Sequence, residues 1–125
     1  MKTGNFKTYR GDKGTAICLY PPLDWSGARF PSLEPNRQTF FARKADVIDD
    51  MEYEKKYREE ILSKLDPQDV YNKLKGQVLL CWEPAGDFCH RRIIAEWIEK
   101  SIGIEVPEWK PEDDAKPETL ANPLF

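Results

Sequence analysis

Most of the residue types that take part in chemistry lie in one stretch, residues 79–92. This stretch holds two of the three cysteines and the only histidine, beside carboxylates and two adjacent arginines. An apolar run leads into it and a helical pattern follows it, which predicts a strand, a short loop and the start of a helix. Open α/β sheets place their ligand sites at such crossovers. The candidate site residues are Cys81, Glu83, Cys89, His90, Arg91 and Arg92.

The helix expected over about residues 88–102 decides which of these side chains face the core. Its apolar residues form one broad stripe, and at about 100° per residue the direction of His90 falls within that stripe. Arg91 lies on the flank of the stripe, whereas Cys89 and Arg92 point to the other side. We therefore expect His90 to face the sheet at the first turn of the helix.

The strand that precedes this helix ends beside the same turn. Cys81 and Glu83 leave the strand there, so the geometry predicts Glu83 and His90, with room for Cys81, in one small space and Arg91 at its rim. A carboxylate and an imidazole in one space suit general acid and base catalysis. We therefore predict Glu83 and His90 as catalytic residues.

Anion binding is the leading interpretation of this stretch. Unpaired backbone N–H groups at a helix start, together with Arg91 and Arg92, suit a phosphate or a carboxylate. The predicted pocket would bind a small anionic or nucleotide-type ligand. Cys89 would line this pocket and is the third candidate catalytic residue, after Glu83 and His90. Cys81 is a candidate ligand-binding residue. We predict no cofactor.

A nucleophilic thiol is a second interpretation. Cys89 lies at a helix start, which lowers the pKa of a thiol, and His90 adjoins it, although Asp87 opposes a thiolate there. The phosphatase pattern Cys-x5-Arg is not met, because Asp87 stands six residues after Cys81, and the sequence has no Cys-x-x-Cys.

Metal binding and a purely structural role are two further alternatives. Cys81, Cys89 and His90 offer three ligands, and Cys18 or Glu83 could supply a fourth. The spacing matches no ordinary zinc knuckle, so we assign no metal ligands. Cysteines also serve as small buried hydrophobic residues, and that interpretation stays open.

A helix expected over residues 46–65 supplies two more candidates. Its acids gather in the first turn, as the helix dipole favours, and Tyr57 lies on its apolar side. Glu54 and Arg58 form an i,i+4 pair near the middle of that side. A charged pair on an inward face is either a structural bridge or part of a site. Tyr57 and Arg58 are therefore candidate ligand-binding residues.

The remaining pattern predicts a short, mainly parallel sheet of about four strands. Residues 77–82 lack alternation, which is typical of a central parallel strand buried on both faces. Residues 15–20 form a second buried strand, residues 6–9 an edge strand and residues 104–106 a last strand. A helix opens at Asp66 and ends at Gly76. We expect an α/β domain of three layers, Rossmann-like, with helices on both faces.

Residues 21–43 form a long loop rich in proline, arginine and aromatic residues. A loop of this length in a small domain is either functional or poorly ordered. It supports an alternative function, in which the protein is a non-catalytic module that binds nucleic acid or a protein partner by stacking and phosphate contacts. The residues concerned are Trp25, Arg29, Arg37, Phe40 and Phe41.

Composition limits the class of protein. A chain of 125 residues suits one domain, expected over residues 1–106, with an acidic, proline-rich tail over residues 107–125. A net charge of −3 gives no general attraction to nucleic acid or to anionic membranes. Three cysteines form no paired framework, and no apolar run approaches the roughly 18 residues of a membrane span, so we expect a cytoplasmic protein without a membrane partner.

The sequence resembles the domain of unknown function 488 (DUF488) family. That family carries a Cys-x-Glu, a short loop and then a Cys-His-Arg at a helix start, and the matching positions here are Cys81, Glu83 and residues 89–91. The likeness is good over about residues 45–106. It implies a small α/β domain with a Rossmann-like sheet and the motif at the crossover from strand to helix. It implies no particular reaction.

Overall fold

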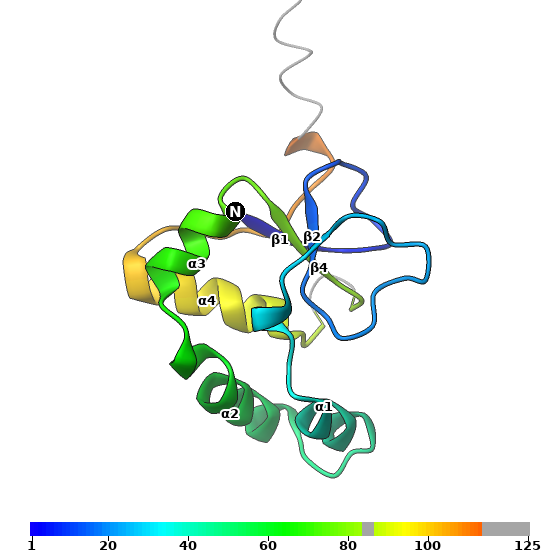
Figure 1. Ribbon diagram of the computed structural model, residues 1–125, viewed down its shortest axis with the longest axis vertical. Helices are drawn as coiled ribbons and strands as arrows, with labels where there is room; N and C mark the ends of the chain where they lie inside the picture. Colours follow the sequence, from blue (N-terminus) through cyan, green and yellow to red (C-terminus); the bar gives the residue numbers. More distant parts are fainter. Residues whose placement is uncertain (84–86, 114–125) are drawn as a thin grey trace, which may run out of the picture.

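Strand β4 (Val78–Cys81) lies in the interior of a four-stranded sheet, because all four of its residues are apolar and buried. The computed structural model describes residues 1–83 and 87–113 (Figure 1). β4 pairs with β1 (Lys2–Asn5) on one side and β2 (Gly14–Ala16) on the other, and β2 pairs with β3 (Ala28–Arg29). All three pairings are parallel and the order is β1-β4-β2-β3. The expected small α/β domain with a parallel sheet is confirmed.

Four α-helices are present among the described residues. They are α1 (Arg37–Lys44), α2 (Asp50–Glu60), α3 (Pro67–Leu74) and α4 (His90–Ile102), with short 3-10 turns at Pro31–Leu33 and Leu62–Lys64. Helix α4 contacts β1 and β4, and α3 packs beside α4 (Figure 1). Helix α2 contacts α4 and α1. Helices α1 and α2 therefore lie opposite the carboxyl end of β4.

The two faces of the sheet are covered differently. Leu79 belongs to the main core, which it shares with residues of α2, α3 and α4. Val78 and Leu80 point to the opposite face, because side chains alternate along a strand, and there they pack against Tyr9 and Trp109. Within the described residues the second face is therefore covered by aromatic side chains, not by the helices expected on both faces.

The ends of the helices follow local capping chemistry. The Asp49 side chain accepts a hydrogen bond from the Glu52 N–H at 2.8 Å, and Asp66 accepts one from the Gln68 N–H at 3.1 Å. Gly103 ends α4 in the left-handed conformation, with φ 73°. The helix expected over residues 46–65 is shorter, because Asp49 caps it at its start.

Two strand predictions were wrong at the ends of the chain. The first strand is β1, not residues 6–9, because the buried backbone of β4 pairs with the small residues Thr3 and Gly4. Residues 104–106 form no strand. Instead the chain reaches β1 two residues later, where Glu108 forms a parallel bridge with Thr3.

Part of the expected loop over residues 21–43 is regular structure. It contains β3, the 3-10 turn at Pro31–Leu33 and most of α1. The loop prediction was wrong there because β3 forms by pairing with β2, a tertiary contact that proline content does not reveal. None of the described helices is long and apolar enough to cross a membrane.

The first residues of the expected tail pack on the sheet. The Thr3 N–H donates to the Pro107 carbonyl at 3.0 Å, and the Trp109 N–H donates to the Thr3 carbonyl at 2.7 Å. The Trp109 side chain is buried against Tyr9, with ring centroids 5.0 Å apart. Pro107–Trp109 therefore close one edge of the sheet. Residues 114–125 of the expected tail lie outside the described residues.

We predict that Trp109→Ala destabilises the fold by about 3 kcal/mol, since it removes a large buried side chain from the second face of the sheet. Urea unfolding at 25 °C measures this change. The fully exposed Leu23 provides a control, and Leu23→Ala should change stability by less than about 0.5 kcal/mol. Equal, small effects of both substitutions would show that residues near 109 do not belong to the folded core.

Candidate active site

A cleft of about 570 Å³ opens at the carboxyl ends of β2 and β4. Cys18 and Leu19 follow β2 into the cleft, residues 81–83 enter it from β4, and residues 87–90 enter it at the start of α4. Side chains of α1 and α2 form the opposite wall. A position outside the carboxyl ends of parallel strands is the usual ligand site of an open α/β sheet.

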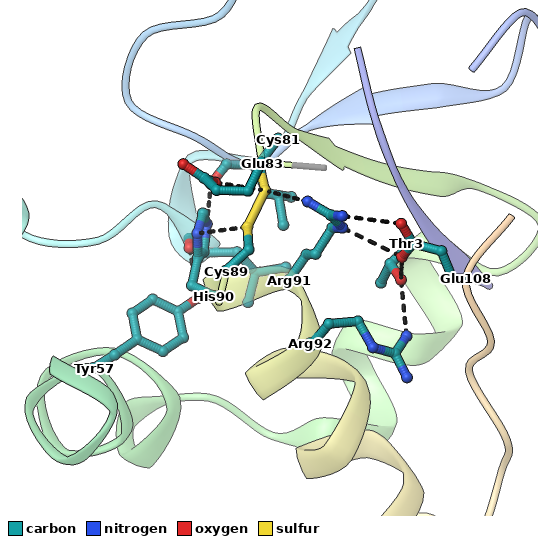
Figure 2. The surroundings of a disulfide bond; sticks show 11 residues. Thr3, Tyr57, Cys81, Glu83, Cys89, His90, Arg91, Arg92 and Glu108 are labelled. Carbon is teal, nitrogen blue, oxygen red and sulfur yellow. Dashed lines mark hydrogen bonds and ion pairs between the residues drawn. A yellow bond between two sulfur atoms is a disulfide. The ribbon is translucent and has the colours of Figure 1, made fainter. Parts of the chain in front are cut away.

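Cys81 and Cys89 form a disulfide at the base of this cleft (Figure 2). Both cysteines are buried. The expectation that Cys89 points away from the sheet was wrong. Cys89 is the N-cap residue of α4, and its φ of −157° is extended, so the helical projection does not apply to it. Sequence spacing alone does not reveal the pairing, since the eight-residue separation spans a strand end, a loop and a helix start.

Cys18 packs against this pair but is not bonded to it. Burial raises the pKa of the Cys18 thiol to about 11. The third cysteine is therefore a protonated thiol at neutral pH, directly beside the disulfide.

His90 faces the sheet, as the sequence predicts. Its Nε2 lies 2.8 Å from the carbonyl oxygen of Ile17. A carbonyl only accepts, so Nε2 carries the proton of the neutral ring and Nδ1 is left as an acceptor. Nδ1 lies 3.9 Å from the Cys89 sulfur. Burial, helped by the nearby charge of Arg91, lowers the pKa of His90 to about 4, so the ring is neutral at pH 7.

Arg91 lies in the interior, not at the rim, with only 1% of its surface exposed. Its Nε and one terminal nitrogen donate to the Glu108 carboxylate at 3.3 and 2.9 Å. The other terminal nitrogen donates to the Cys81 sulfur at 3.1 Å. The rim prediction was wrong because Glu108, from the segment expected as a tail, supplies the carboxylate that a buried guanidinium needs.

Glu83 lies close to the sulfur pair. Its Oε1 is 3.6 Å from the Cys81 sulfur (Figure 2). Burial, with the nearby charges of Glu83 and Glu60, raises the pKa of Tyr53, which lines the same cleft. The Tyr53 hydroxyl therefore stays protonated at neutral pH.

Three expected ligand-binding side chains are engaged elsewhere. Arg92 donates to the Thr3 hydroxyl at 2.8 Å and to the Val106 carbonyl at 2.9 Å. The Tyr57 hydroxyl is buried and donates to the Leu33 carbonyl at 2.6 Å. Arg58 pairs with two glutamates of α2 and α4 at 2.9 and 2.7 Å, and with Arg92 it lines a separate depression.

The cleft also contains residues that sequence reasoning did not assign to it. Phe40 and Lys44 of α1 and Tyr53 of α2 line it, and the Lys44 ammonium lies 5.4 Å from the centre of the Phe40 ring. Arg43 lines it as well but is paired with Asp46 and Asp50. The aromatic and basic composition of residues 37–44 was the feature of the sequence that could have indicated their place in the cleft.

Three potential metal ligands converge at the base of the cleft. Donor atoms of Cys81, Cys89 and His90 all lie within 4.8 Å of one another. The two sulfur atoms are bonded to each other, so an ion could bind there only after reduction of the disulfide.

The chain belongs to the DUF488 family. Residues 10–102 match the family model DUF488-N3a, described as the active DUF488-N3 subclade. This confirms the family suggested by the Cys-x-Glu and Cys-His-Arg elements. Searches of curated proteins and of solved structures found no match.

We predict that the ring of His90 does not titrate between pH 5.5 and 8 in the folded protein. The chain has one histidine, so its ring signal in proton NMR is unambiguous. Because the folded pKa of about 4 lies below the ordinary value of 6.5, the unfolded chain takes up a proton first as the pH falls. Stability should therefore decrease between pH 7 and 4, by about 3 kcal/mol from this residue.

His90→Gln provides the comparison, since it removes the titrating ring and leaves the acids of the chain unchanged. Its urea-unfolding free energy should fall less steeply over the same pH interval than that of the wild-type protein. An NMR midpoint near 6.5, or parallel pH profiles for the two proteins, would contradict the buried, neutral ring.

Proposed function

We propose that the cleft at the carboxyl ends of β2 and β4 is an enzyme-like pocket for a small anionic or nucleotide-type ligand. The observation that carries this proposal is the composition of its walls. Aromatic rings and a cation from α1 and α2 face Glu83, which follows β4, and the imidazole and disulfide sulfur at the start of α4. A volume of about 570 Å³ lies within the usual range of small-molecule sites.

The aromatic walls suit a planar group. Phe40 of α1, Tyr53 of α2 and Phe88 before α4 line the cleft from different elements. Stacking on such rings is a sequence-tolerant way to hold a base. This composition favours a nucleotide-type ligand over a simple inorganic ion.

The anionic part of the ligand would lie near Lys44. Among the described residues, Lys44 makes no ion pair with a carboxylate, whereas Arg43 is held by two of them. The start of α4 borders the same cleft, and the positive end of its helix dipole favours negative charge there. Arg91 is less suited to hold the anion, because Glu108 and Cys81 already take its donors.

Catalysis in this pocket would depend on Glu83 and on the pair formed by Cys89 and His90. Glu83 lines the cleft and is partly exposed, so it can exchange a proton with a bound ligand. His90 Nδ1 faces the Cys89 sulfur at 3.9 Å, so it can take the proton of the Cys89 thiol once the disulfide is reduced. The description of the matching subclade as active supports an enzymatic role.

The alternative function, a nucleic-acid or protein binding module formed by residues 21–43, has weaker support. Trp25 packs against Phe6 with ring centroids 5.2 Å apart, and its Nε1 donates to the Ala28 carbonyl. Arg29 pairs with Glu34 at 3.0 Å. These side chains are largely occupied by contacts within the fold.

We infer a cytoplasmic location from the odd number of cysteines. In that compartment the disulfide between Cys81 and Cys89 would be a transient one.

We predict that adenosine monophosphate binds this cleft and that Phe40→Ala weakens its binding about tenfold, because one stacking contact is lost. Isothermal titration calorimetry measures both affinities. Lys44→Met should weaken the binding of adenosine monophosphate but not that of adenosine, since only the former carries the anion.

Phe41→Ala is the matched control, because Phe41 follows Phe40 in the same helix, is half exposed and does not line the cleft. It should leave the affinity unchanged. No binding of the nucleotide by the wild-type protein, or equal losses in the two phenylalanine variants, would rule out a nucleotide-type ligand in this cleft.

A further inference from the structure

We propose that Cys81 and Cys89 form a reversible redox pair that reduces small hydroperoxides, with Cys81 as the attacking sulfur and Cys89 as the resolving one. The proposal rests on the surroundings of the two sulfurs and does not depend on the anionic ligand. It predicts an activity for the base of the cleft that persists when no nucleotide-type molecule binds.

The charge around Cys81 distinguishes it from the other cysteines. A terminal nitrogen of the buried Arg91 donates to its sulfur at 3.1 Å, which favours the thiolate once the disulfide is reduced. Glu108 holds the guanidinium in this position through two further hydrogen bonds. The Glu83 carboxylate, 3.6 Å from the same sulfur, is within reach to take the thiol proton.

Cys89 is arranged to act second. Its sulfur faces the unprotonated Nδ1 of His90 at 3.9 Å, and the ring cannot turn freely because Nε2 is tied to the Ile17 carbonyl. A neutral imidazole accepts the thiol proton when the thiol attacks. His90 is therefore a positioning and proton-accepting residue for Cys89.

All three cysteines border the cleft, but only the Cys81 sulfur accepts a hydrogen bond from Arg91 among the described residues. Both sulfurs line the cleft, although each side chain is nearly buried. Cys18 touches them, but its raised pKa keeps it protonated and unreactive at neutral pH. The chain thus contains a reactive pair and a matched inert thiol in one cluster.

The reaction balances as follows. The Cys81 thiolate attacks the terminal oxygen of a hydroperoxide, the O–O bond breaks, and the alkoxide leaves with both electrons and takes a proton from solvent. Cys81 is then a sulfenic acid. The Cys89 sulfur attacks the sulfenic sulfur, and its proton passes through His90 as the hydroxide departs, because the buried ring is too weak a base to hold that proton. The S–S bond forms and hydroxide leaves, which takes up that proton as water. An external dithiol restores both thiols and becomes a disulfide itself.

Thiol counting in the full-length protein tests the pair, with reduction and oxidation carried out on the native protein and the thiols counted after denaturation, which exposes Cys18. Dithiothreitol should raise the count from one thiol to three, and hydrogen peroxide, added after the reductant is removed, should return it to one. Mass spectrometry should assign the remaining thiol to Cys18. A pair that resists native reduction, or three thiols that persist in peroxide, would overturn the proposal.

Single substitutions test the order of the two sulfurs. In Cys89→Ser, peroxide should leave a sulfenic acid on Cys81 that dimedone traps, whereas Cys81→Ser should give at least about tenfold less adduct on Cys89. Cys18→Ser is the control and should behave as the wild-type protein. Equal trapping in both variants would overturn the assignment of Cys81, and one equivalent of zinc in the protein as purified would overturn the redox role.

The pH profile of alkylation tests Arg91 as a positioning residue. In the Cys89→Ser background, iodoacetamide should react with Cys81 with a midpoint below the ordinary thiol value of about 8.5. Arg91→Met should raise that midpoint, and Arg91→Lys should restore it in part. If circular dichroism shows that Arg91→Met does not fold, the midpoint of Arg91→Lys tests the role of Arg91, and the dimedone result tests the role of Cys81. An unchanged midpoint in a folded variant would contradict the role of Arg91.

Discussion

The burial of the Arg91 guanidinium is the constraint on which most of this structure depends. A charged side chain loses its water only where partners replace it, and an unpaired guanidinium in the interior would cost several kcal/mol. The carboxylate of Glu108 and the sulfur of Cys81 supply those partners. One side chain of α4 thereby joins the end of β4 to the C-terminal segment.

The same constraint links the β1 edge of the sheet and the C-terminal segment to the sulfur pair. Glu108 also accepts a hydrogen bond from the Thr3 hydroxyl at 2.6 Å, and Thr3 in turn accepts one from Arg92. Strand β1, the start of α4 and the C-terminal segment therefore share one polar network on the flank of the sheet (Figure 2). The network positions the Cys81 sulfur, because Arg91 donates to it and is itself held by Glu108.

The opposite wall of the cleft is built by a different pair of elements, α1 and α2. Lys44 and Phe40 lie on the short helix α1, which packs mainly against α2. The sulfurs and the imidazole at the base of the cleft thus face a wall built by α1 and α2.

How far the sequence predicts the site depends on whether each side chain belongs to a regular element. His90 is inside α4, so helical periodicity places it correctly against the sheet. Cys89 is one residue earlier, with an extended backbone, so the same periodicity misplaces it. Arg91 follows the helical pattern, but its burial depends on Glu108, 17 residues further along the chain. Long-range partners of this kind leave no local signal.

The sequence by itself therefore determined the class of fold, the central strand and the crossover that carries the site, because apolar periodicity and capping residues are local properties. Its Cys-x-Glu and Cys-His-Arg elements also determined the family. The tertiary structure alone decided that Cys81 bonds to Cys89, that Glu108 satisfies Arg91, and that α1 closes the cleft. Each of these contacts joins different elements of the structure, and the free energy of burying a charge or a sulfur depends on which element packs over it.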